Sequence, residues 1–74
     1  MWETGIIHVG DVAVKYEAKV FEEGSQYGID GGRISRLWMA IDGEEIINYD
    51  RGWDMRPETE IAERVHAKVL EFYS

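Results

Sequence analysis

The sequence predicts a single α+β domain over residues 1–74, a four-stranded antiparallel meander followed by one C-terminal helix packed on one face (β-β-β-β-α). Three observations support this. Residues 12–21 alternate between apolar and charged side chains, the pattern of a strand with one buried face. The dipeptides Gly10-Asp11 and Asp42-Gly43 are typical of two-residue hairpin turns. Residues 57–73 repeat apolar side chains at helical spacing.

The first three strands are expected at residues 2–9, 12–21 and 34–41. One face of the second strand is apolar and carries Val12, Val14, Tyr16, Ala18 and Val20. The core side of the third strand carries Leu37, Met39 and Ile41. Its opposite side carries Ile34, Arg36, Trp38 and Ala40. The pattern therefore places an Arg and a Trp next to each other on the outer surface of the sheet.

The fourth strand is expected at residues 44–50 and ends in a turn at Arg51-Gly52. Pro57 suits the first position of the helix that follows, because the N–H that proline lacks is not needed there. The apolar stripe of this helix consists of Ile61, Ala62, Val65, Val69, Phe72 and Tyr73. One helix covers only one side of the sheet, so the other side stays in water or meets a partner.

The small size of the chain limits how it can be stabilised. Domains of this size bury only about 60% of their unfolded surface. Without cysteine there is no disulfide and no thiolate–metal site. Stability must come from a compact core or from burial against other copies, so we expect a homo-oligomer. No apolar run has transmembrane length and no signal peptide is recognisable, so we expect a cytoplasmic protein without membrane contact.

The charge of the chain is acidic overall and cationic in the middle. A net charge of −7 and a pI of about 4.6 argue against general binding to DNA, RNA or anionic membranes. Half of the eight Lys and Arg residues lie mid-chain, as Arg33, Arg36, Arg51 and Arg56. This distribution predicts a local cationic site on an acidic body.

The most unusual stretch is the connection at residues 22–33, which is rich in glycine. It is longer than most connections in compact domains, which have about 4–6 residues. The N–H groups of Gly31 and Gly32 can approach an anion, and Arg33 and Arg36 can clamp a phosphate. Several aromatic side chains nearby can stack on a base. We therefore expect a ligand-binding set of Tyr27, Asp30, Gly31, Gly32, Arg33, Arg36, Trp38, Tyr49, Arg51 and Trp53.

A purely structural interpretation of these residues also stays open. The spacing matches neither a P-loop nor a dinucleotide fingerprint, and the loop leads into a strand. The glycines can instead serve tight turns while the aromatic residues fill a small core, and Trp53 suits a core position under the helix. No nucleophile motif is present, and neither His8 nor His66 has a metal-ligand neighbour at a known spacing. We expect no cofactor, no metal and no catalytic residue.

Four stretches are shared with known sequences: Trp2-x-x-Gly5, residues 17–24, Tyr-Gly-Ile-Asp-Gly-Gly-Arg-Ile-Ser at 27–35, and Asn-Tyr-Asp-Arg-Gly-Trp-Asp at 48–54. On these, the chain resembles a family of short uncharacterised proteins of phages and of bacteria that carry prophages. The resemblance implies a viral product acting in the bacterial cytoplasm and transfers no site residues. Small phage proteins of this kind are often counter-defence factors. Some sequester nucleotide-derived immune signals between subunits, and others clamp a defence enzyme.

Three functions follow as hypotheses. The first is a homo-oligomer that sequesters a small phosphate-bearing nucleotide without turning it over. The second is an inhibitor of a host defence protein, acting through an acidic face that imitates nucleic acid or through the exposed sheet. The third is an enzyme that cleaves such nucleotides with Asp30, Asp50 or Asp54 as base.

Overall fold

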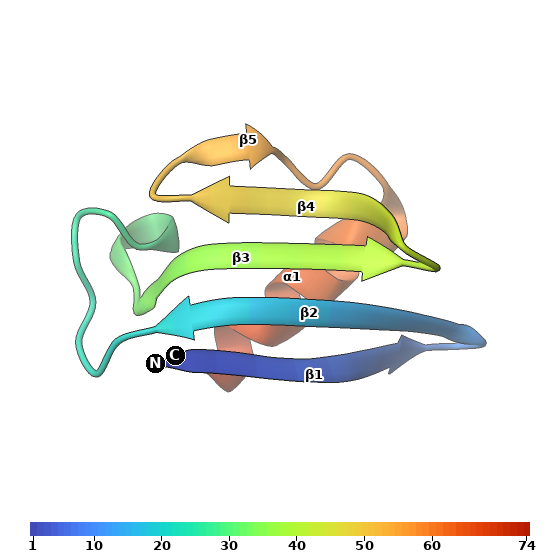
Figure 1. The fold of residues 1–74 in the computed structure, drawn as a ribbon, viewed down its shortest axis with the longest axis horizontal. Helices are drawn as coiled ribbons and strands as arrows, with labels where there is room; N and C mark the ends of the chain where they lie inside the picture. Colours follow the sequence, from blue (N-terminus) through green and yellow to red (C-terminus); the bar gives the residue numbers. More distant parts are fainter.

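The computed structural model describes all 74 residues and contains one antiparallel sheet with one helix across it (Figure 1). The strands follow one another in the sheet in chain order. They are β1 (Trp2–Val9), β2 (Val12–Val20), β3 (Ile34–Ile41), β4 (Glu44–Asp50) and β5 (Trp53–Met55). The helix α1 (Glu60–Phe72) follows them. The predicted α+β meander with a C-terminal helix is therefore confirmed.

The sheet has five strands where the sequence predicted four. β5 is only three residues long and pairs Trp53 with Tyr49 and Met55 with Asn48. So short a strand carries no readable alternation, which explains why it was predicted as the end of a turn. The other strands match their predicted ranges, except that β2 ends at Val20 rather than Phe21.

The two predicted hairpin turns are both present. Val9 pairs with Val12 around Gly10-Asp11, and Ile41 pairs with Glu44 around Asp42-Gly43. The backbone of Asp42 and Gly43 has φ angles of +50° and +81°. Two consecutive positive φ values define the type I′ turn that Asp-Gly favours, because its twist matches that of the flanking strands.

A bulge at Ser35 changes the face on which β3 begins. Lys19 pairs with Arg36 while Val20 pairs with Ile34, so Ser35 is the additional residue. Ile34 consequently joins the core, with 2% of its surface exposed. Its predicted position on the outer side was wrong for this reason. Arg36 and Trp38 lie beyond the bulge and keep to the outer side, as predicted.

The helix begins three residues later than predicted. Thr59 is its N-cap, and the side-chain oxygen of Thr59 accepts a hydrogen bond from the Ala62 N–H at 3.1 Å. Pro57 therefore precedes the helix and is not its first residue. Phe72, predicted on the apolar stripe, is instead 75% exposed at the helix end. No helix has the length and apolar character needed to cross a bilayer.

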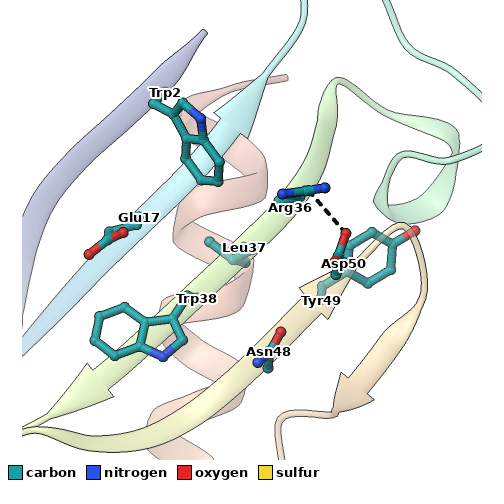
Figure 2. Close-up of a pocket in the computed structure, with 8 residues that line it drawn as sticks. All are labelled: Trp2, Glu17, Arg36, Leu37, Trp38, Asn48, Tyr49 and Asp50. Carbon is teal, nitrogen blue, oxygen red and sulfur yellow. Dashed lines mark ion pairs between the residues drawn. The ribbon is translucent and has the colours of Figure 1, made fainter.

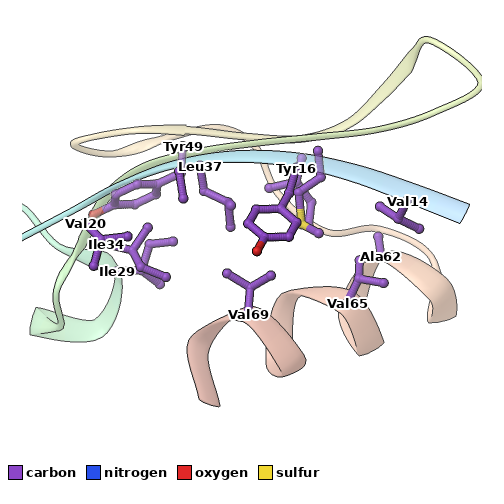
Figure 3. Close-up of a cluster of buried hydrophobic side chains, with 13 residues drawn as sticks. Val14, Tyr16, Val20, Ile29, Ile34, Leu37, Tyr49, Ala62, Val65 and Val69 are labelled. Carbon is purple, nitrogen blue, oxygen red and sulfur yellow. The ribbon is translucent and has the colours of Figure 1, made fainter. Parts of the chain in front are cut away.

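The core lies between the sheet and α1, and Figure 3 shows the helix side chains directed toward the strands. The buried cluster consists of Val14, Tyr16, Ala18, Val20, Ile29, Ile34, Leu37, Met39, Ile47, Tyr49, Ala62, Val65 and Val69. At the end of the helix, the hydroxyl groups of Tyr16 and Tyr73 lie 3.0 Å apart in a hydrogen bond. The core thus reaches from β2 and β4 to the last turn of α1.

The glycine-rich connection between β2 and β3 folds back on itself. It contains a short 3-10 helix, Ile29–Gly31, which buries Ile29 in the core. A Cβ on Gly28 would lie 1.9 Å from the carbonyl oxygen of Gly32, so only glycine lets the two backbone segments meet. The Tyr49 hydroxyl donates a hydrogen bond to the Tyr27 carbonyl at 2.9 Å and fastens the loop to the sheet.

Candidate functional site

The sheet leaves one face uncovered, and we call it the open face: the side opposite α1. Because neighbouring strands are in register, paired residues share a face. Trp2 pairs with Lys19, Glu17 with Trp38, Trp38 with Asn48, and Arg36 with Asp50. These side chains therefore form rows across β1 to β4 on the open face.

A shallow cavity of about 150 Å³ lies within these rows (Figure 2). It is lined by Trp2, Glu17, Arg36, Leu37, Trp38, Asn48, Tyr49 and Asp50. Figure 2 shows the indoles of Trp2 and Trp38 on either side of Glu17, with Arg36 and Asp50 at one end. The cavity therefore combines two flat aromatic surfaces, one guanidinium, one amide and two carboxylates.

Two arginines share one carboxylate at the end of this cavity. The Nε atom of Arg36 lies 3.0 Å from Oδ1 of Asp50, and the Nε atom of Arg51 lies 3.8 Å from the same oxygen. Lys19 stands opposite Arg36 on the neighbouring strand. Arg36 and Arg51 thus share Asp50, and the side chain of Arg36 is 42% exposed. This end of the cavity has two arginines and one carboxylate, and Glu17 lines the cavity as a second carboxylate.

Arg33 does not line this cavity, and its guanidinium forms hydrogen bonds with main-chain oxygens of the same protomer. Its Nε donates to the Phe21 carbonyl at 2.8 Å. One terminal nitrogen donates to the main-chain oxygens of Tyr73 and Ser74 at 3.3 and 3.2 Å. A cation is favourable there, because the last carbonyls of a helix carry partial negative charge. Arg33 lines cavities beside the loop and the helix end, whereas Arg36 lines the one on the open face.

The other predicted site residues are also divided. Asp30 and Gly32 line a cavity with Arg33, and Gly31 belongs to the same short helix. Tyr27 is 52% exposed on the loop. The predicted clamp of two arginines therefore does not form at one place in this protomer. Of the predicted residues, only Arg36, Trp38 and the neighbouring Arg51 gather at the open face, while the cavity reaches the buried Tyr49 from that side.

Trp53 and Tyr49 belong mainly to the helix side. Their rings meet edge to face with centroids 5.0 Å apart, and the Trp53 ring also meets His66 at 5.3 Å. The Arg56 guanidinium lies 5.5 Å from the Trp53 ring. Tyr49 is 7% exposed. These contacts place both aromatic rings in the packing of the domain.

Five residues of the open-face cavity were not in the predicted set: Trp2, Glu17, Leu37, Asn48 and Asp50. Alternation within each strand could have assigned each of them to a face. Their grouping depends on the register between strands, and the bulge at Ser35 shifts that register by one residue. The sequence therefore lacked the information on which residues of neighbouring strands pair with each other.

Two titratable groups on the helix side are perturbed. Burial lowers the pKa of His66, while the carboxylates of Asp30 and Glu63 act in the opposite direction. The Nε2 atom of His66 is buried without a hydrogen-bond partner. Burial, and then the hydrogen bond with Tyr16, raises the pKa of Tyr73 above its usual value. Neither side chain lines the open-face cavity, so both bear on folding.

Comparison with known families shows one relationship. The whole chain, residues 1–74, matches the model of a family described as a domain of unknown function, DUF7678. Comparison with curated proteins and with solved structures gives no match. A function must therefore be argued from the open face.

Proposed function

We propose that this chain, which belongs to the DUF7678 family, is a non-catalytic protein that binds a nucleotide-derived, phosphate-bearing ligand on its open face. One observation carries the proposal: Trp2, Trp38, Arg36 and Asn48 surround a single exposed cavity. Indoles stack on nucleobases, a guanidinium holds phosphate, and an amide both donates and accepts hydrogen bonds. These are the groups that recognition of a nucleotide requires.

The Asp50 carboxylate supports this assignment. Because Asp50 lies near both Arg36 and Arg51, it can remain with Arg51 while a phosphate takes its place on Arg36. Lys19, across from Arg36, adds charge for the same anion. The exchange leaves Asp50 with a cation, so its own desolvation cost on binding stays small.

The size of the cavity supports binding by an assembly. At about 150 Å³ it is smaller than the roughly 300–1,000 Å³ of sites that enclose a ligand. One copy therefore covers one side of a nucleotide, and we propose that the protein works as a homo-oligomer. Together with the resemblance of residues 27–35 and 48–54 to small phage proteins, this leads us to propose sequestration of an immune signal in the bacterial cytoplasm.

Isothermal titration against adenine nucleotides, including cyclic and conjugated ADP-ribose, tests the proposal. We expect one of them to bind, and Trp38→Ala and Arg36→Ala each to weaken it about tenfold or more, since base stacking contributes about 1–3 kcal/mol. Arg64→Ala, an exposed arginine on α1, is the matched control and should bind like the wild type. Absence of heat with every nucleotide contradicts the proposal.

The state of the recovered ligand separates binding from catalysis. Denaturing the complex should release the nucleotide chemically unchanged, as sequestration requires. Release of a cleaved product would instead assign the hydrolytic role to a nearby carboxylate such as Asp50.

A second function, inhibition of a host defence protein, is favoured by the exposure of Trp2 beside Arg36 and Trp38. Trp and Arg are the residue types that dominate protein–protein hot spots. The open face carries Lys15, Lys19 and Arg36 against Glu17, Glu45 and Asp50, so its charges balance, and such contact would be aromatic and not an acidic imitation of nucleic acid. Stoichiometric capture of one host protein, lost in Trp38→Ala, would favour this alternative over nucleotide binding.

A further inference from the structure

The outer edge of β1 has an unpaired backbone. Met1 and Val20 exchange both main-chain hydrogen bonds, at 3.1 and 2.8 Å. Bonded and non-bonded pairs alternate along an antiparallel ladder. The odd-numbered residues of β1 therefore bond to β2. The N–H and C=O groups of the even-numbered residues point away from the sheet, at Trp2, Thr4, Ile6 and His8.

This edge has little of the usual protection, because Glu3 is its only Asp, Glu, Lys or Arg. Natural edge strands are shortened, bulged or marked with Lys or Pro, which prevents them from pairing with other chains. β1 has eight residues without Lys or Pro, and its ladder with β2 runs without a register shift. Trp2 and Ile6 on it are 54% and 62% exposed. The opposite edge, β5, has only three residues.

An apolar cavity of about 340 Å³ lies directly beside this edge, on the helix side. It is lined by Ile6, Ile7, Tyr16, Lys68, Val69, Phe72 and Tyr73. Figure 1 shows the end of α1 reaching past β1, and Phe72 is 75% exposed there. A strand added to β1 would therefore pair with its backbone and pack its helix-side residues against Phe72.

We propose that the added strand is β1 of a second copy, paired antiparallel about a two-fold axis at Gly5. A two-fold axis normal to the sheet keeps both helices on one side of the joined sheet. Open-face residues of one copy can therefore pair only with open-face residues of the other, and helix-side residues only with helix-side residues. In the register centred on Gly5, Trp2 lies opposite the partner's His8 and Thr4 opposite the partner's Ile6. All four outward-pointing residues of each copy are then paired.

Charge complementarity selects a second copy as the occupant. Glu3 lies on the helix side near one end of β1, and Lys68 lies beside Ile6 and Ile7 near the other end. Neither residue forms an ion pair within the protomer. In the proposed register Glu3 stands opposite the partner's Ile7 and so arrives beside the partner's Lys68. The two-fold axis creates this pair twice.

The dimer would join two sheets into one continuous sheet, with both open faces on the same side, so it doubles the binding face and does not itself enclose a ligand. Trp2 borders the open-face cavity, so the partner's His8 would stand at its rim. Pairing at this edge needs no bound nucleotide, because the backbone edge, the apolar cavity and the two charges all belong to the protein itself.

Sedimentation equilibrium of the wild type and of Thr4→Pro tests the edge. The proline removes an outward N–H and spares the ladder with β2, and edge strands tolerate it. We expect a wild-type dimer whose association constant falls at least about tenfold in Thr4→Pro, since two bonds per dimer are lost. Thr4→Val, which keeps the N–H, should remain a dimer. A monomeric wild type, or a Thr4→Pro dimer as tight as the wild type, overturns the proposal.

A charge exchange tests the register without altering the backbone. Glu3→Lys and Lys68→Glu should each weaken self-association several-fold, because each places like charges together twice. Mixing the two variants should restore dimers, since in the mixed dimer both pairs are again of opposite sign. Failure of the mixture to associate overturns the register. A wild type that stays monomeric but captures an extended peptide at β1 overturns the choice of a second copy.

Discussion

Arg33 and Arg36 stand three residues apart in one motif, yet the fold treats them differently. Arg33 donates three hydrogen bonds to main-chain oxygens of Phe21, Tyr73 and Ser74. Arg36 faces one carboxylate, Asp50, which it shares with Arg51. Releasing Arg33 would leave carbonyl groups without a donor, whereas Arg36 can exchange one anion for another. The number and kind of partners therefore decide which of the two guanidinium groups is held in place.

The region around Arg33 should be the more sensitive to substitution, and Gly28→Ala is its severest test. The new methyl group would collide with the Gly32 carbonyl, which belongs to the backbone and cannot rotate away. We expect a loss of about 3 kcal/mol in the free energy of unfolding, at the upper end of overpacking effects. Urea denaturation measures it.

Gly52→Ala is the matched control for this prediction, because a Cβ at Gly52 meets no atom within 4 Å. It should change stability by less than about 0.5 kcal/mol. Equal effects at the two glycines would show that the packing of the loop is not what requires Gly28.

Replacing each arginine with alanine should affect stability and binding in opposite order: Arg33→Ala should cost more stability, and Arg36→Ala should cost more nucleotide affinity. Arg33→Ala should cost about 1.5 kcal/mol of unfolding free energy, because charged hydrogen bonds to main-chain oxygens are lost. Arg36→Ala should cost less than about 1 kcal/mol, as expected of an exposed ion pair. Denaturation and titration on the same two variants measure both effects. If Arg33→Ala left stability unchanged while abolishing nucleotide binding, Arg33 would be the ligand-binding residue and its structural role would be wrong.

The difference between the two arginines could not be predicted from the sequence. Alternation placed Arg36 on the outer side correctly, and Asp-Gly and Gly-Asp gave both hairpins, because these signals depend only on near neighbours. The bulge at Ser35 and the contact between Arg33 and the chain end depend on partners 12 to 41 positions away. Local patterns do not contain such pairings, so the loop and Arg36 were assigned to one site when the structure separates them.

Tyr73 anchors the same region through its hydroxyl group, so its loss should have an intermediate effect. Tyr73→Phe removes the 3.0 Å hydrogen bond to Tyr16 and should cost about 1 kcal/mol. Because burial raises the pKa of Tyr73 in the folded state, its contribution to stability is complete below the unfolded pKa and is lost as the pH rises past about 10. Thermal unfolding of both proteins at pH 8 and 11 should show a smaller alkaline loss in Tyr73→Phe.

Replacing His66 should have the smallest effect on stability. Its dependence on pH should be opposite to that of Tyr73, because stability is lost as the pH falls. Its folded pKa lies below 6.5, because burial disfavours the charged imidazole and Nε2 has no acceptor. The unfolded chain then binds the proton more readily, so stability is complete above pH 6.5 and decreases as the pH falls from there toward the folded pKa. Melting temperatures at pH 7.5 and 5.0 should differ less in His66→Leu than in the wild type. A wild type whose stability rose on acidification, relative to His66→Leu, would mean that the nearby Asp30 and Glu63 carboxylates outweigh burial, and that this end of the domain is organised by charge and not by packing.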